Sequence, residues 1–156
     1  MKYTIVLVED EVNLNNLVKT YLEHAGYNVI SFYTGHEALK NINVNAHLWI
    51  LDIMLPDDIN GYDIIKKIRE TNEIMPVIFT SARDKDLDKI IGLELGSDDY
   101  ITKPYSSKEL VLRVNNIIKR VYNKSQKVIY ENYEIDVEKR VCYDNKKELE
   151  LTTLEF

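Results

Sequence analysis

The stretch that decides the fold is MKYTIVLVEDE (residues 1–11), a short apolar run that stops abruptly at three acids. Its centre is continuously apolar, which is typical of a strand covered on both faces by helices. The acids follow too early for a signal peptide or a membrane anchor. Similar short runs recur along the chain: NVISFY (28–33), HLWILD (47–52), PVIFTS (76–81) and DYIT (99–102). We therefore predict five strands.

Segments between these runs carry apolar residues at helical spacing. The first segment has one apolar stripe, ended by Gly26 as a C-terminal cap: Leu14, Leu17, Val18, Tyr21, Leu22 and Ala25. Two other segments begin with capping boxes, Thr34–Glu37 and Ser106–Glu109. The remaining two are marked by Ile64, Ile65 and Ile68, and by Leu87, Ile90, Ile91 and Leu95 before Gly96. Strands alternating with helices predict an α/β fold, a doubly wound five-stranded parallel sheet over residues 1–122.

The overall composition excludes several classes of protein. The net charge of −6 argues against general binding to nucleic acid or to an anionic membrane. The single cysteine, Cys142, has no partner for an internal disulfide, which fits a reducing cytoplasm. No apolar stretch approaches the roughly 20 residues of a membrane helix. We expect a cytoplasmic protein without a membrane partner.

The character of the sequence changes after Val121. Residues 123–127 (NKSQK) are polar and lack periodicity, which suits a linker, and residues 128–156 have the pattern of a short antiparallel β remnant. Roughly thirty residues are too few for a stable independent domain. We therefore interpret residues 128–156 as the beginning of something larger.

Three acids follow two of the predicted strands. Glu9 and Asp10 come directly after the first run, and Asp52 ends the third. Ligands of open parallel sheets bind outside the carboxyl ends of the strands, so these carboxylates converge if the two strands are neighbours. A Mg²⁺ ion would relieve their repulsion, because it prefers oxygen ligands. The alternative is three solvated acids in surface loops.

A hydroxyl and an ammonium group occupy corresponding positions on the last two strands. Ser81 ends the fourth run, and Lys103 follows the fifth. Taken singly, such residues are usually a turn serine and a solvated lysine. Acids, hydroxyl and ammonium at one sheet edge together indicate phosphoryl transfer, which depends on positioning and charge neutralisation.

Five motifs then resemble the receiver domain of two-component response regulators: VEDE (8–11), LDIMLP (51–56), TSAR (80–83), GSDDYITKP (96–104) and SSKEL (106–110). The resemblance implies a flavodoxin-like fold and phosphorylation of Asp52 by a sensor histidine kinase. It also implies Mg²⁺ as cofactor and a cis bond before Pro104. The implied roles are Mg²⁺ ligation by Glu9, Asp10, Asp52 and the Met54 carbonyl, a switch hydroxyl on Ser81 (Thr80 as second choice), a rotating Tyr100 and a phosphate-pairing Lys103.

The loop after LDIMLP, DDINGYD, is one residue longer than is usual in that family. Its acids, Asp57 and Asp58, border the expected metal site. We interpret them as an exposed acidic loop, with an extra metal ligand as the alternative.

Residues 132–156 resemble the opening of the winged-helix effector domain of OmpR/PhoB-type regulators, with LTTLEF (151–156) matching the start of its first helix. The recognition helix is absent, so we expect promoter DNA to be bound only through a further C-terminal region. The chain is then either a fragment or a natural truncated product. In this subfamily phosphorylation favours a homodimer, and the matching charged positions are Lys89, Asp98, Asp99, Glu109, Arg113 and Arg120.

Three rival functions fit less well. A dehalogenase-like phosphatase needs a second Asp two residues after the nucleophile, where this chain has Met54. A flavodoxin-like cofactor binder needs a phosphate-cradling loop after the first strand, where Glu9 and Asp10 stand instead. A receiver that only mediates interactions would not need the full set of acids, hydroxyl and lysine. We therefore expect a phosphoacceptor and not a turnover enzyme.

Overall fold

The structure is a computed structural model that describes residues 2–82 and 96–123. The chain divides into two compact units, Met1–Ile117 and Ile118–Phe156, and the sheet belongs to the first. The strands are β1 (Thr4–Val8), β2 (Asn28–Phe32), β3 (Leu48–Asp52), β4 (Val77–Ser81) and β5 (Asp99–Thr102). The helices are α1 (Val12–His24), α2 (Gly35–Lys40), α3 (Gly61–Thr71) and α5 (Ser107–Tyr122).

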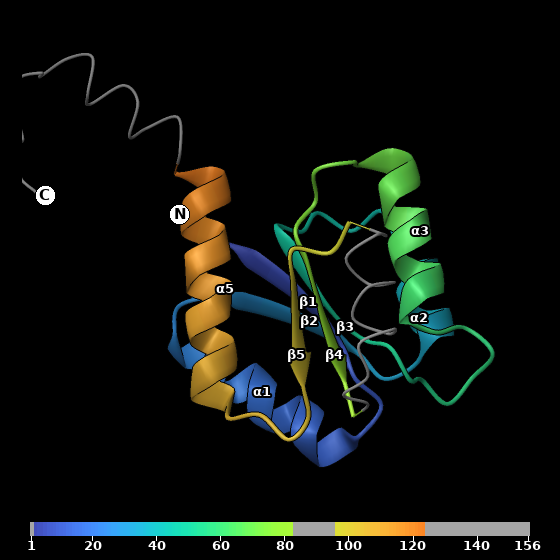
Figure 1. Ribbon diagram of the computed structural model, residues 1–156, viewed down its shortest axis with the longest axis horizontal. Helices are drawn as coiled ribbons and strands as arrows, with labels where there is room; N and C mark the ends of the chain where they lie inside the picture. The colour runs from blue at the N-terminus through green and yellow to red at the C-terminus, as the bar shows by residue number, and fades with distance from the viewer. Residues whose placement is uncertain (1, 83–95, 124–156) are drawn as a thin grey trace, which may run out of the picture. The chain divides into compact units, whose positions relative to one another are not determined.

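The five strands form one sheet in the order β2-β1-β3-β4-β5, and every pairing is parallel (Figure 1). This confirms the predicted α/β sheet, and each predicted run overlaps its strand. The strand order reverses between β1 and β3, which are direct neighbours with Val8 opposite Leu51. The carboxyl ends of these two strands therefore meet at the point where ligands bind in such sheets.

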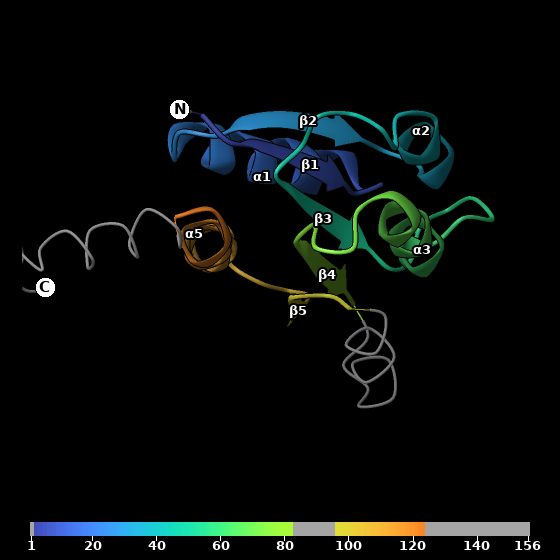
Figure 2. The same ribbon diagram turned by 90° about the horizontal axis from the view of Figure 1, so that it is seen from above.

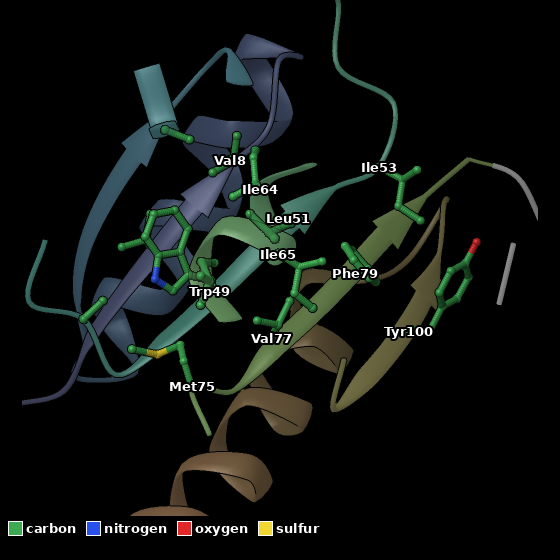
Figure 3. Close-up of a cluster of buried hydrophobic side chains, with 14 residues drawn as sticks. Val8, Trp49, Leu51, Ile53, Ile64, Ile65, Met75, Val77, Phe79 and Tyr100 are labelled. Atoms are coloured by element: carbon green, nitrogen blue, oxygen red, sulfur yellow. The ribbon is translucent and has the colours of Figure 1, made fainter. Parts of the chain in front are cut away.

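Helices cover both faces of the sheet, with α1 and α5 on one side and α2 and α3 on the other (Figure 2). Strand side chains alternate between the faces. On the α3 side, Trp49 and Leu51 of β3 and Phe79 of β4 join one buried cluster, shown with Tyr100 of β5 in Figure 3. β3 and β4 are buried at every residue, and their sequences are apolar up to the polar residues at their carboxyl ends.

Most of the predicted helix ends are confirmed. Gly26 follows α1 with φ of +102°, a conformation that favours glycine. The Thr34 hydroxyl accepts a bond from the Glu37 N–H (3.1 Å), but the Glu37 carboxylate reaches the N–H of Tyr33 and not that of Thr34. The Ser106 hydroxyl accepts from the Glu109 N–H at 2.9 Å.

The prediction of a single core-facing stripe is wrong for three of its members, of which Ala25, just after α1, is exposed. Val18 and Leu22 are buried, whereas Leu17 and Tyr21 are about half exposed. The third buried position of α1 is polar, Asn15. The core therefore takes a narrower face of this helix than its apolar residues suggest.

Several predictions lie outside the described residues. These are the helix marked by Leu87, Ile90, Ile91 and Leu95, the interface residue Lys89, most of the linker, and the β remnant at 128–156.

Candidate functional site

Glu9, Asp10 and Asp52 meet at the carboxyl edge of β1 and β3, as predicted. One oxygen from each carboxylate lies within 4.8 Å of the others. Glu9 is 1% exposed and Asp52 2% exposed, so these two are not solvated surface acids. Buried carboxylates at this spacing need positive charge to remain ionised.

Glu9 is fixed by two local contacts. Its Oε2 accepts a hydrogen bond from the Glu11 N–H at 3.0 Å. The side-chain amide of Asn15 donates to the carbonyls of Glu9 (2.9 Å) and Phe32 (3.2 Å) and so holds the ends of β1 and β2 together. Sequence reasoning missed Asn15, although its helical spacing to the apolar Val18 and Leu22 was a signal for it.

Lys103 supplies positive charge to the cluster from the end of β5. Its Nζ lies 2.8 Å from Glu9 Oε1 and 2.9 Å from Asp52 Oδ2. The Lys103 N–H donates to the Ser81 carbonyl at 2.7 Å, which fixes the backbone beside β4. Burial works against the ammonium charge, but the bonds to Glu9 and Asp52 outweigh it and raise the pKa of Lys103 above its ordinary value. The bond from Lys103 to Pro104 is cis, as the resemblance implied.

Asp52 has an unusual acidity. Burial and the neighbouring Glu9 charge raise its pKa to about 7, although Lys103 and the N–H of Met54 oppose this rise. The Met54 N–H donates to Asp52 Oδ1 at 3.1 Å. Gly61 allows the loop to close here, since a Cβ at Gly61 would lie 2.7 Å from the Asp52 carbonyl oxygen.

This raised pKa predicts a pH-dependent stability in the absence of metal. In the folded protein Asp52 takes up a proton as pH falls through about 7. In the unfolded chain the same carboxylate is protonated only as pH falls through about 4. The free energy of unfolding should therefore rise by about 1–3 kcal/mol as pH falls from above 7 towards 4. Urea denaturation in a chelator at about pH 8 and about pH 5 measures the difference. Asp52→Asn should lack this component, and an unchanged pH dependence in that variant would contradict the assignment.

The donor set fits a Mg²⁺ ion. Three ionised carboxylates and one ammonium leave two negative charges, which a divalent cation balances. All three side chains offer oxygen ligands, as Mg²⁺ prefers, and the partly exposed Asp10 leaves room for bound water.

The two candidate hydroxyls lie on different faces of β4. Thr80 is the register partner of Asp52 on β3. Ser81, one residue nearer the carboxyl end of β4, is the register partner of Thr102 on β5. Both are buried. Strand alternation places Ser81 on the same face as Phe79 and its partner Tyr100. The choice of Ser81 over Thr80 stays a prediction.

Tyr105 was not predicted. Burial and the nearby Glu9 charge raise the pKa of its hydroxyl to about 12. With Leu14, Ala82, Lys103 and Pro104 it lines a mainly apolar cavity of about 340 Å³ beside the acids. An aromatic residue two positions after the functional lysine was the available signal.

Charged residues predicted for a dimer interface form contacts within the chain. Arg113 lies 2.8 Å from the Asp99 carboxylate and 3.0 Å from that of Glu109. The Asp98 carboxylate accepts a hydrogen bond from the Val77 N–H at 2.9 Å. Arg120 lies in the last turn of α5.

The acids of the longer loop stand apart from this cluster, which among the described residues comprises Glu9, Asp10 and Asp52. The Asp57 carboxylate accepts hydrogen bonds from the backbone N–H groups of Gly35 (3.3 Å) and His36 (2.9 Å). Asp58 lies 2.9 Å from His36 Nε2. Both acids therefore contact α2.

The sequence around this site matches a known protein family. Residues 5–115 match the response regulator receiver domain. The chain belongs to the response regulator receiver family. This confirms the resemblance drawn from the five motifs, and phosphorylation on an aspartate is the general role of that family.

Relatives of this receiver include transcriptional regulators. The chain is 46% identical to the transcriptional regulatory protein CssR of Bacillus subtilis, over 100% of this chain and 72% of CssR. It is 38% identical to CpxR of Escherichia coli, over 97% of this chain and 68% of CpxR. The response regulator SaeR of Staphylococcus epidermidis is 39% identical, over 85% of this chain and 57% of SaeR.

Solved structures agree with the fold of the receiver. The BeF3-activated DrrB receiver domain has a TM-score of 0.71 at 34% identity, covering 76% of this chain and 99% of that one. The response regulator DrrB of Thermotoga maritima, described as an OmpR/PhoB homolog, has a TM-score of 0.71 at 35% identity, covering 77% of this chain and 54% of DrrB. Within residues 2–82 and 96–123, none of the helices combines the length and apolar character needed to cross a membrane.

Proposed function

We propose that Asp52 of this receiver accepts a phosphoryl group from a sensor histidine kinase, with Mg²⁺ held by Glu9, Asp10, Asp52 and the Met54 carbonyl. The observation that carries the proposal is the Lys103 ammonium, which lies within 3 Å of both Glu9 and Asp52 at the edge where Asp10 joins them. Acetyl phosphate should label the protein in the presence of Mg²⁺ and not in the presence of a chelator, and this tests the proposal.

The chemical step is a displacement at phosphorus. A carboxylate oxygen of Asp52 forms the new P–O bond while the P–N bond to the kinase histidine breaks, and the imidazole leaves with the electron pair. Bound Mg²⁺ would neutralise charge on the transferring phosphoryl oxygens. Lys103 supplies a second positive charge from the carboxyl end of β5, at the same edge of the sheet, and the Met54 N–H orients the attacking carboxylate.

Phosphorylation then acts through Ser81 and Tyr100. A phosphoaspartate adds charge and acceptor oxygens, which the Ser81 hydroxyl and the Lys103 ammonium can engage. Ser81 and Tyr100 share one face of neighbouring strands, so inward movement of Ser81 makes space that Tyr100 fills. Tyr100 is 7% exposed and lies in the buried cluster, which supports its use as a packing switch.

The receiver offers the kinase an apolar surface on α1. Leu17 and Tyr21 are about half exposed on α1. Leu14, one turn earlier, lines the cavity with Pro104 and Tyr105. A kinase helix packed here would bring its phosphohistidine to the same edge of the sheet and would cover apolar residues of α1 that the core does not use.

Transcription is the proposed output of the signal. CssR and CpxR are named as transcriptional regulatory proteins, and CssR aligns over the whole of this chain. We propose that residues 123–127 link the receiver (1–122) to a winged-helix domain that begins at about 128 and needs further sequence to bind promoter DNA. The chain is then a cytoplasmic phosphoacceptor and not a turnover enzyme.

Phosphorylation should also drive homodimerisation, and the charged positions that match the interface of the subfamily are Lys89, Asp98, Asp99, Glu109, Arg113 and Arg120. Arg113 is central, because its guanidinium holds two acids and is still 36% exposed. Sedimentation velocity with acetyl phosphate and Mg²⁺ should show a dimer for the wild type.

Arg113→Ala should weaken this dimer by about tenfold, because an interfacial charge network loses one of its cations. Lys67→Ala is the matched control, since it removes a cation from an exposed ion pair with Glu70 on α3. Equal dimerisation of Arg113→Ala and the wild type would contradict this interface.

A further inference from the structure

The loop between β3 and α3 is fastened to α2 by three successive residues. Asp57 accepts hydrogen bonds from the N–H groups of Gly35 and His36, and Asp58 pairs with the His36 ring. Ile59 packs directly against Gly35. A Cβ added at position 35 would lie 2.7 Å from both the Cβ and the carbonyl oxygen of Ile59. A side chain at position 35 would therefore separate the loop from the helix.

These contacts differ in strength. Partial burial works against ionisation of Asp57, but the N–H donors of His36 and Gly35 outweigh it and lower the pKa of Asp57. The Asp58 side chain is 86% exposed, and its partner His36 is 59% exposed. An exposed pair of this kind contributes little. Asp57 is therefore the main attachment of the loop to α2.

The same loop begins at the phosphoacceptor. The Met54 N–H donates to Asp52 Oδ1, and the Ile53 carbonyl accepts from the Gly61 N–H at 3.1 Å. Asp57 is the third residue after Met54, a reach of at most about 10 Å. Between them, Leu55 packs against the buried cluster and Pro56 has a fixed φ. A displacement of Asp57 is thus passed to the backbone of Met54 by a short, stiff connection.

We propose that Asp57 is a positioning residue that sets the Mg²⁺ affinity of the site. It holds the β3–α3 loop against the N-terminus of α2, and the position of this loop fixes the Met54 carbonyl. This inference rests on the proposed Mg²⁺ site at Glu9, Asp10 and Asp52. It assigns a role to the lengthened acidic loop: Asp57 is neither a solvated acid nor an extra metal ligand, but the anchor of a ligand-bearing segment.

Direct measurement of Mg²⁺ binding by titration calorimetry tests this role. Asp57→Ala removes both backbone contacts and should weaken Mg²⁺ binding by about fivefold or more, in the manner of residues that orient metal ligands. Asp57→Asn keeps one acceptor oxygen and should bind with an affinity between those of Asp57→Ala and the wild type. Asp58→Asn is the matched control, because it removes the same charge from the same loop without touching the backbone of α2, and it should stay within about twofold of the wild type.

Thermal unfolding of each variant in a chelator first establishes that it is folded at the titration temperature, and Asp57→Asn carries the test if Asp57→Ala is not. An unchanged Mg²⁺ affinity in both Asp57 variants would overturn the proposal. Equal weakening by Asp57→Asn and Asp58→Asn would also overturn it, because loop charge alone would then explain the effect. Absence of Mg²⁺ binding by the wild type would instead refute the proposed metal site itself.

Discussion

Replacing Asp52 by Asn should reduce Mg²⁺-dependent labelling by acetyl phosphate to background. An amide retains the size of the carboxylate and an oxygen that can accept from the Met54 N–H, but it is not a nucleophile towards phosphorus. The effect is therefore expected on the chemistry and not on the fold. Labelling is measured as the fraction of protein that gains one phosphoryl group in intact-mass spectra.

The control for this variant is Asp58→Asn, which removes an exposed acid six residues further along the same segment. It should be labelled to the same extent as the wild type. Removing the Asp52 charge should also stabilise the metal-free protein above pH 7, because Glu9 then loses a buried like-charged neighbour. Labelling of Asp52→Asn at the wild-type stoichiometry would show that another residue is the acceptor.

Replacing Lys103 by Met should make the stability of the domain depend strongly on Mg²⁺. The Lys103 ammonium is the cation that contacts both Glu9 and Asp52, and Met keeps the length of the stem without the charge. Breaking a buried ion pair from one side is costly, although protonation of Asp52 limits the cost here. We expect a loss of about 2 kcal/mol in the free energy of unfolding in a chelator, most of it restored by Mg²⁺.

Urea denaturation of Lys103→Met with and without Mg²⁺ measures this dependence. Lys67→Met removes an exposed lysine that pairs with Glu70 at 3.4 Å, and it should change little under either condition. If metal-free Lys103→Met is as stable as the wild type, the ammonium does not neutralise the acidic cluster in the way proposed.

The fold and the centre of the site could be predicted because both depend on strand ends. Parallel strands bring their carboxyl ends to one edge, so acids directly after β1 and β3 had to meet once the two strands were neighbours. Lys103 follows from the same rule. The contact of Lys103 with both Glu9 and Asp52 could not be predicted, because the reach of a lysine side chain does not specify its partner.

Other features depend on packing that a sequence pattern does not contain. Leu17 and Tyr21 have the spacing of core residues on α1 but are half exposed, whereas the polar Asn15 occupies a buried position on this helix. That asparagine tethers the backbone of Glu9, a contact made through space that no spacing reveals. Asp57 likewise has the sequence context of a surface acid, and its two N–H donors on α2 become its neighbours only in the folded chain.

The most direct test of the phosphoacceptor assignment is peptide mapping of the labelled protein. After reaction with acetyl phosphate and Mg²⁺, the acyl phosphate is reduced with borohydride and the modified peptide is sequenced by mass spectrometry. We expect the modification on Asp52 alone, within LDIMLP. Modification of Asp10 or of any other residue, with Asp52 unmodified, would contradict the assignment.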